Sequence, residues 1–339
     1  MLSRYLSFVV LGLLILAAPA RAYTPESGVW WNPAEPGTGI LLEIQDNFLF
    51  AAVYSYDGAG FATWYTTAGF LTGNARYDGQ LDAFRGGPCL SCSYRPNTAF
   101  PGNGGPIRID FASNDATKAT VSWGGRSFPI ERFQFYLKRP EDGSRPLSLT
   151  KMLGEWQMVL DFSSAPNLFP YYGELLIFED IDLSESPGYV EGCRGGNSVD
   201  GFCRSSDLAN HDATGYFDSV TREHVIVVND STDNFAVYII KVGTNHAQGE
   251  FSVYRKGTQP TTFYPVRGFR SASRTFVEEG IGPSKSAEPA AIKPGIGDLI
   301  DVEALNRPKL GEQAKRRSGI ELARLQQIIA ELEAHLVQD

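Results

Sequence analysis

Hydrophobic and polar residues alternate with a period of two along residues 28–137, which is the pattern of half-buried β-strands. Residues 107–111, for example, read Ile-Arg-Ile-Asp-Phe. Short turn sequences interrupt the alternation, among them the Asp-Gly pair at 57–58, where glycine accepts the positive φ of a hairpin turn. The short and regular spacing predicts an antiparallel meander.

Residues 147–270 repeat this style, with apolar runs such as 235–242 separated by polar turns. A Gly-x-Trp sequence opens both halves, at 28–30 and at 154–156. An internal duplication and two unrelated small β domains are both open interpretations. The predicted fold class is mainly β, an antiparallel up-and-down meander or barrel, with two such domains and a C-terminal helix. The predicted segments are a signal peptide at 1–22, β domains at 23–146 and 147–270, a flexible linker at 271–317 and an amphipathic helix at 318–337.

The predicted C-terminal helix carries one apolar seam. Ser318 and Glu321 have the spacing of a capping box. The seam residues recur at a 3,4,3,4 spacing and are Leu322, Leu325, Ile329, Leu332 and Leu336. Since so short a helix is marginal alone in water, it must pack on something. Docking on its own domain, a coiled-coil homo-oligomer and contact with a membrane surface are the three alternatives.

The first 22 residues have the three parts of a secretory signal peptide. Arg4 is the basic part, Leu6 to Ala18 is an apolar run, and Ala20-Arg21-Ala22 is a cleavage site, so Tyr23 is the expected mature N-terminus. The apolar run is too short to span about 30 Å of hydrocarbon comfortably, which disfavours an uncleaved anchor. We expect export to the periplasm or beyond, with no transmembrane segment after cleavage.

The net charge and the cysteine content are consistent with the predicted export. The whole chain has a net charge of -9, and removal of residues 1–22 leaves 28 basic against 39 acidic residues, a net charge of about -11. This balance disfavours binding to nucleic acid. In an exported chain the four cysteines indicate disulfides, and local pairing of Cys89 with Cys92 and of Cys193 with Cys203 is the simplest of three connectivities. No helical pattern follows Cys92, so a structural role is favoured over redox catalysis.

Residues 28–65 carry a specific motif, G-x-W-W-N-P, then G-x-G, then Y-D-x-x-G-x-x-x-W-Y. It resembles the pattern of a family of secreted proteobacterial proteins of uncharacterised function, and the resemblance covers residues 28–137. That family has no known catalytic residues to carry over. In plan the meander also resembles the up-and-down barrels of lipocalins and avidins, where lipocalins pack the Trp of G-x-W against a late Arg. The resemblance implies a cation–π contact of Trp30 with Arg132, and of Trp156 with Arg267 or Arg270.

Aromatic residues crowd the first domain and are the candidate ligand-binding residues. The set is Trp30, Trp31, Tyr54, Trp64, Tyr65 and Trp123. They line either a pocket or face for a small hydrophobic molecule or a glycan, or the ordinary core of a barrel. Both faces of the strand at 48–56 are apolar, so that strand is either covered twice or exposes an interaction surface.

The sequence contains no strong motif for metal binding or catalysis. The four histidines show no ligand spacing, so we assign no metal, no cofactor and no catalytic residue. The primary prediction is a non-enzymatic exported protein that binds or scaffolds. One alternative is a hydrolase acting on an envelope polymer, with carboxylates at Glu43 and Asp46 or at Glu174, Glu179 and Asp180. The other is a structural oligomer assembled by residues 318–337.

Overall fold

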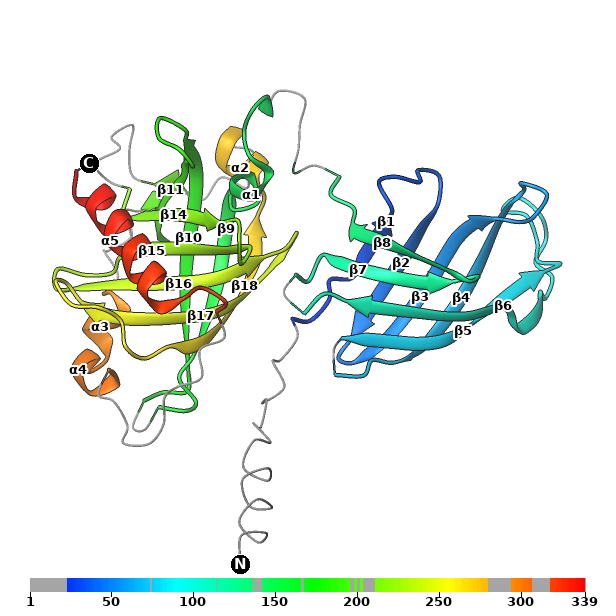
Figure 1. Ribbon diagram of the computed structural model, residues 1–339, viewed down its shortest axis with the longest axis horizontal. Helices are drawn as coiled ribbons and strands as arrows, with labels where there is room; N and C mark the ends of the chain where they lie inside the picture. Colours follow the sequence, from blue (N-terminus) through cyan, green and yellow to red (C-terminus); the bar gives the residue numbers. More distant parts are fainter. Residues whose placement is uncertain are drawn as a thin grey trace, which may run out of the picture.

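The computed structural model contains two closed eight-stranded antiparallel barrels, which confirms the predicted fold class (Figure 1). It describes residues 23–338 except 74, 114, 136, 138–141, 166–167, 196–197, 200–201, 204–210, 280–293 and 307–317. The predicted signal peptide at 1–22 lies outside the described residues.

Barrel 1 is an up-and-down barrel in which each strand pairs with the next and the last strand pairs with the first. Its inner face carries the alternating apolar residues, so that Ile107 and Ile109 are buried while Arg108 between them is exposed. The strands are β1 (Gly28–Trp31), β2 (Gly39–Gln45), β3 (Phe48–Tyr56), β4 (Ala62–Phe70), β5 (Arg76–Arg85), β6 (Thr98–Phe111), β7 (Lys118–Trp123) and β8 (Arg126–Arg132).

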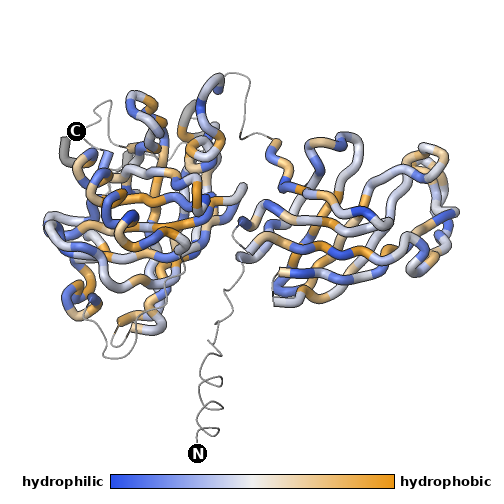
Figure 2. Tube along the Cα trace, viewed as in Figure 1, coloured by the Kyte–Doolittle hydropathy of each residue, from blue (hydrophilic) through white to orange (hydrophobic). Residues whose placement is uncertain are grey.

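Barrel 2 follows the short helix α1 (Leu147–Thr150) and has the same up-and-down order, with β18 closing on β9. Figure 2 shows hydrophobic positions concentrated in the strands of both barrels. The strands are β9 (Gly154–Asp161), β10 (Tyr171–Asp182), β11 (Tyr189–Arg194), β14 (Ala213–Asp218), β15 (Glu223–Asn229), β16 (Asn234–Val242), β17 (His246–Arg255) and β18 (Tyr264–Ala272). A separate pair, β12 (Ser198–Val199) and β13 (Phe202–Cys203), lies in the connection after β11.

A tryptophan and an arginine close barrel 2 where its first and last strands meet. Arg270 lies opposite Trp156, and its guanidinium carbon is 4.2 Å from the centre of the indole ring. The same guanidinium donates to the carbonyl oxygens of Lys151 and Leu153, while the indole Nε1 donates to that of Met152 at 2.7 Å. The predicted cation–π contact of Trp156 is therefore confirmed, with Arg270 rather than Arg267.

Barrel 1 is closed by an equivalent pair. Arg132 lies opposite Trp30, whose indole Nε1 donates to the carbonyl of Glu26, again four residues earlier, at 3.0 Å. The guanidinium of Arg132 donates to the carbonyl oxygens of Ser27, at 2.9 Å, and Phe133, at 2.6 Å. In this corner the arginine thus acts through hydrogen bonds to the residues just before β1 and just after β8, and not through the expected contact with the indole face.

The glycine two residues before each tryptophan leaves room for the arginine. Gly28 has φ +127° and Gly154 has φ +123°, a region that residues with a side chain rarely adopt. A Cβ on Gly28 would collide with the guanidinium of Arg132, and one on Gly154 would lie 2.5 Å from the carbonyl oxygen of Ala272. Two corners with the same offsets and the same glycine conformation support the interpretation of an internal repeat.

Part of the segment expected to be a linker packs on barrel 2. It contains α2 (Arg274–Glu279), α3 (Ile296–Leu299) and α4 (Val302–Leu305). Ile296, Ile300 and Leu305 are buried in the same apolar cluster as the interior of barrel 2. The amino-acid sequence did not predict these helices. Each spans little more than one turn, so its stability comes from tertiary contacts and not from helix propensity.

The C-terminal helix α5 (Leu322–Gln338) lies across the outer face of β14 and β15 (Figure 1). Most of its apolar residues are buried against barrel residues, so the structure shows docking on its own domain. The cluster comprises Leu325, Ile328, Ile329 and Leu332 with Val225, Val227, Val237 and Ile239. No helix within the described residues is long and apolar enough to cross a membrane.

The start of this helix differs from the capping-box prediction. The helix begins at Leu322, and the hydroxyl of Ser318 donates to the carboxylate of Glu223 at 2.9 Å. The same hydroxyl accepts from the backbone N–H of Ile320. The serine that the sequence pattern predicted as the N-cap therefore hydrogen-bonds to Glu223, a buried residue of barrel 2, instead of capping the helix.

Two leucines on α5 provide a matched test of this docking. Leu325→Ala empties a fully buried position, so we expect it to lower the free energy of unfolding by about 2–5 kcal/mol. Leu322→Ala, at a position that is 49% exposed, should cost less than about 1 kcal/mol. Urea unfolding followed by circular dichroism checks both, and equal effects would contradict docking of the seam.

Candidate functional site

The two ends of barrel 1 have different surroundings. The connections β1–β2, β3–β4 and β7–β8 lie at one end because successive strands run in opposite directions. The β6–β7 turn lies at the other end, where Asp115 pairs with Arg222 of barrel 2 at 2.7 Å. The first end is therefore the free mouth of barrel 1, on the far side from barrel 2 (Figure 1).

A pocket of about 240 Å³ opens at this mouth. Four aromatic residues contribute to its lining, Trp31, Tyr54, Trp123 and Phe128, together with the apolar residues Ile40, Val53 and Ile130. Its polar lining residues include Asn32, Glu35, Thr38, Ser55 and Arg126. An apolar pocket with a few convergent polar groups is the usual form of a small-molecule site.

Neighbouring groups hold the two tryptophans of this pocket in place. The indole Nε1 of Trp123 donates to the carbonyl of Gly104 at 2.7 Å, and its ring meets Tyr65 edge to face at 5.6 Å. Trp31 meets Phe133 edge to face at 4.9 Å. Rings fixed in this way lose little conformational freedom when a ligand binds.

An ion pair lies at the rim of the pocket. The guanidinium of Arg126 donates to the carboxylate of Glu35 at 2.5 Å, and both side chains remain largely exposed. The guanidinium also lies 5.8 Å from the centre of the Phe128 ring. The pair supplies adjacent donor and acceptor groups beside the aromatic faces.

The structure divides the six predicted aromatic residues into three groups. Trp31, Tyr54 and Trp123 line the pocket, and Tyr65 supports Trp123 from behind. Trp30 is fully buried in the core. Trp64 lies on the outer wall, stacked on Phe84 at 5.0 Å. Sequence reasoning missed Glu35 and Arg126, which lie 91 residues apart and meet only because β8 closes on β1.

The outer face of β3 is exposed rather than covered. Phe48, Phe50, Tyr54 and Tyr56 are between 41% and 52% exposed, whereas the alternate residues of the strand face the core. Of the two predictions for this strand, the structure shows the exposed apolar surface.

Both predicted disulfides are present. Cys89–Cys92 closes an exposed turn, and Cys193–Cys203 is buried beside β10. Disulfides persist in oxidising compartments, which indicates a location outside the cytosol.

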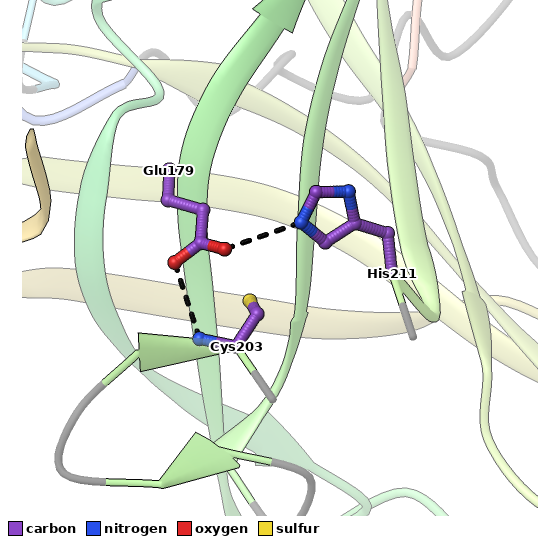
Figure 3. A group of neighbouring side chains, drawn as sticks. All are labelled: Glu179, Cys203 and His211. Carbon is purple, nitrogen blue, oxygen red and sulfur yellow. Dashed lines mark hydrogen bonds and ion pairs between the residues drawn. The ribbon is translucent and has the colours of Figure 1, made fainter. Parts of the chain in front are cut away.

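Glu179, Cys203 and His211 gather next to the buried disulfide (Figure 3). Glu179 accepts from the backbone N–H of Cys203 at 3.1 Å and pairs with His211 Nε2 at 3.2 Å. The carboxylate of Glu179 raises the pKa of His211. Because the sulfur of Cys203 is bonded to Cys193, it supplies no thiolate to a metal.

The carboxylates considered for hydrolysis have separate partners. Glu174 is buried in barrel 2 with Arg194 at 3.0 Å, and burial raises the pKa of Glu174 to about 6. Glu179 is engaged with His211 instead. Glu43 and Asp46 are exposed. None of these contacts sets two carboxylates on opposite sides of a shared substrate space, as glycoside hydrolysis requires.

His224 lies inside the body of barrel 2 near the end that faces barrel 1. Its Nε2 is 2.7 Å from the carbonyl oxygen of Ser148, and its ring packs on Phe217 at 4.9 Å. Burial lowers the pKa of His224 to about 4, so this imidazole is neutral at pH 7.

Comparisons of the chain with models of protein families, with curated proteins and with solved structures found no match in any of the three. The site must therefore be interpreted from its own geometry.

The two disulfides should differ in their accessibility to reductant. Cys89–Cys92 is exposed, whereas Cys193 and Cys203 are at most 6% exposed. Because a thiolate must reach the sulfur it attacks, limited dithiothreitol under native conditions should reduce Cys89–Cys92 first. Alkylation followed by mass spectrometry measures the order. Equal rates at the two disulfides would contradict burial of the second.

His224 should make the protein sensitive to mild acid. Between pH 6.5 and 4 the unfolded chain binds a proton on this imidazole and the folded chain does not. The free energy of unfolding therefore falls as the pH drops through this range, by up to about 3 kcal/mol. His224→Gln should flatten this part of the stability profile, and His246→Gln, at an exposed position, should leave it intact. Urea unfolding at a series of pH values measures both.

Proposed function

We propose that this chain is an exported carbohydrate-binding protein that holds one sugar ring at the mouth of barrel 1. The observation that carries the proposal is that Trp31, Tyr54 and Trp123 all contribute to the lining of one pocket, with the Glu35–Arg126 pair at its rim. Glu35 comes from the β1–β2 connection, and Arg126 is the first residue of β8.

The chemistry of a pyranose matches this lining. A sugar ring has apolar C–H faces, which pack on aromatic rings, and a rim of hydroxyls that donate and accept hydrogen bonds. The carboxylate of Glu35 accepts such bonds, the guanidinium of Arg126 donates them, and Asn32 can do both. A volume of about 240 Å³ is below the roughly 300–1,000 Å³ of drug-sized sites, which favours a single ring.

A purely hydrophobic ligand fits less well. Seating an acyl chain against the rim would remove water from Glu35 and Arg126 without offering them new hydrogen bonds, which costs free energy. The polar rim therefore favours a glycan over a lipid.

Two observations support the proposal of export: the sequence of residues 1–22 and the two disulfides. Residues 1–22 have the arrangement of a cleaved secretory signal. The four cysteines form two disulfides, which reducing compartments do not sustain. Glycans of a cell envelope or its surroundings are ligands that such a protein would meet.

The test is a titration of the purified mature chain with neutral hexoses, amino sugars, their disaccharides and a fatty acid, followed by tryptophan fluorescence. We expect at least one sugar to bind and the fatty acid not to bind. Trp31→Ala and Trp123→Ala should each weaken that binding at least tenfold, because each removes an aromatic ring from the residues that line the pocket.

Trp64→Ala is the matched control, since Trp64 is a large exposed ring on the same barrel but lies outside the pocket. It should leave the affinity within about twofold. A flat response across all sugars, or an equal loss in the Trp64 and Trp123 variants, would rule out this site.

A further inference from the structure

A second cavity, of about 640 Å³, lies between the two barrels. Barrel 1 contributes the residues that precede β1 and the turn between β6 and β7. Barrel 2 contributes α1, the β14–β15 and β16–β17 turns and part of β18. The cavity is thus at the opposite end of barrel 1 from the aromatic pocket, and the proposed function does not use it.

The charge of this cavity is opposite to that of the whole chain. Four cationic side chains line it, Lys151, Arg222, Lys241 and Arg267, against two carboxylates, Glu26 and Asp115. The chain as a whole carries a net charge of -9. A cleft with charges of one sign in an oppositely charged protein attracts ligands of the other sign.

One of the two carboxylates, Glu26, is already occupied by the protein. Its Oε1 accepts from the backbone N–H groups of Thr244, at 2.7 Å, and Asn245, at 3.4 Å. Its Oε2 lies 4.0 Å from Arg132. Glu26 therefore joins the two barrels through these hydrogen bonds.

The other carboxylate, Asp115, is occupied as well. Its Oδ1 accepts from the backbone N–H and the hydroxyl of Thr117, at 2.9 and 2.6 Å. Its Oδ2 pairs with Arg222 at 2.7 Å. Both acids in the cavity thus have full sets of partners.

Lys151 has no such partner. Within the part of the chain that the structure describes, its ammonium makes no hydrogen bond or ion pair, although the residue is half-buried. Its backbone is held by α1 and by the hydrogen bond from Arg270 to its carbonyl oxygen. Burial lowers the pKa of Lys151, because the ammonium loses water, and the nearby charges of Asp115 and Glu26 offset this only in part.

We infer that the cavity between the barrels binds a small organic anion through a phosphate or carboxylate group placed against Lys151. Lys241 lines the same cavity, and Arg222 lies beside it in its ion pair with Asp115. Apolar side chains at Ile44, Leu147 and Phe217 would contact the neutral body of the ligand. Because both barrels line the cavity, such a ligand would also strengthen the contact between them.

Isothermal titration calorimetry of the mature chain at low ionic strength tests this inference. The probes are inorganic phosphate, glycerol 3-phosphate and citrate, with glycerol as the neutral control. We expect at least one anion to bind, glycerol not to bind, and affinity to fall as salt is added. The phosphate and citrate arms distinguish the two oxyanion classes.

Lys151→Gln should weaken the binding of that anion at least tenfold, because it removes the cation without a partner. Lys256→Gln, which removes an equal charge far from the cavity on barrel 2, should leave it unchanged. If Lys151→Gln does not fold by circular dichroism, Lys241→Gln takes its place with the same expectation. Trp123→Ala should not alter anion binding, which separates this site from the sugar pocket.

Absence of heat with all three anions would overturn the inference. So would an affinity that is the same in the Lys151 and Lys256 variants, since the binding would then be a property of the general surface.

Discussion

Both barrels depend on one contact, the closure of the last strand on the first by a buried tryptophan and an arginine. In each corner the indole Nε1 donates to a carbonyl four residues earlier, and the guanidinium donates to carbonyls of the chain entering the barrel. Without this closure, β1 and β9 would each be an edge strand with unpaired backbone groups. The same bonds fix the segments that lead into Trp30 and Trp156, and those segments line the cavity between the barrels.

The closure of each barrel also determines where a ligand can bind. An eight-stranded barrel fills its interior with side chains, which leaves its ends and outer walls for ligands. In barrel 1 the free end carries aromatic residues and an ion pair. The other end contributes Glu26 and Asp115 to the cavity between the barrels, where the lysines and arginines of barrel 2 line the opposite side. Sugar binding and anion binding would therefore use opposite ends of one barrel.

The aromatic residues show how far the sequence could predict the site. The sequence shows that the first domain is rich in aromatic residues. Three of the six aromatic residues predicted to bind a ligand contribute to the lining of one pocket. The sequence did not separate Trp30, which is buried, from its neighbour Trp31, because the two differ only in the face of the strand on which they lie. Trp64 has the same residue type as Trp123 but stacks on the outer wall. Glu35 and Arg126 carried no signal, since they become neighbours only when the barrel closes.

The sequence by itself determined the fold class and the presence of an amphipathic C-terminal helix, because alternation, turns and spacing are local properties of the chain. Of the three possible disulfide connectivities it favoured the local one, which the structure shows. Tertiary structure decided what the C-terminal helix covers: its seam meets Val225 and Val237 of barrel 2. Tertiary structure also decided which groups the acids bind. Glu26 accepts from the backbone of Thr244, and Asp115 pairs with Arg222, and both partners belong to barrel 2. Charge balance inside a cavity depends on distances between residues remote in sequence, and only the closed and docked barrels set those distances.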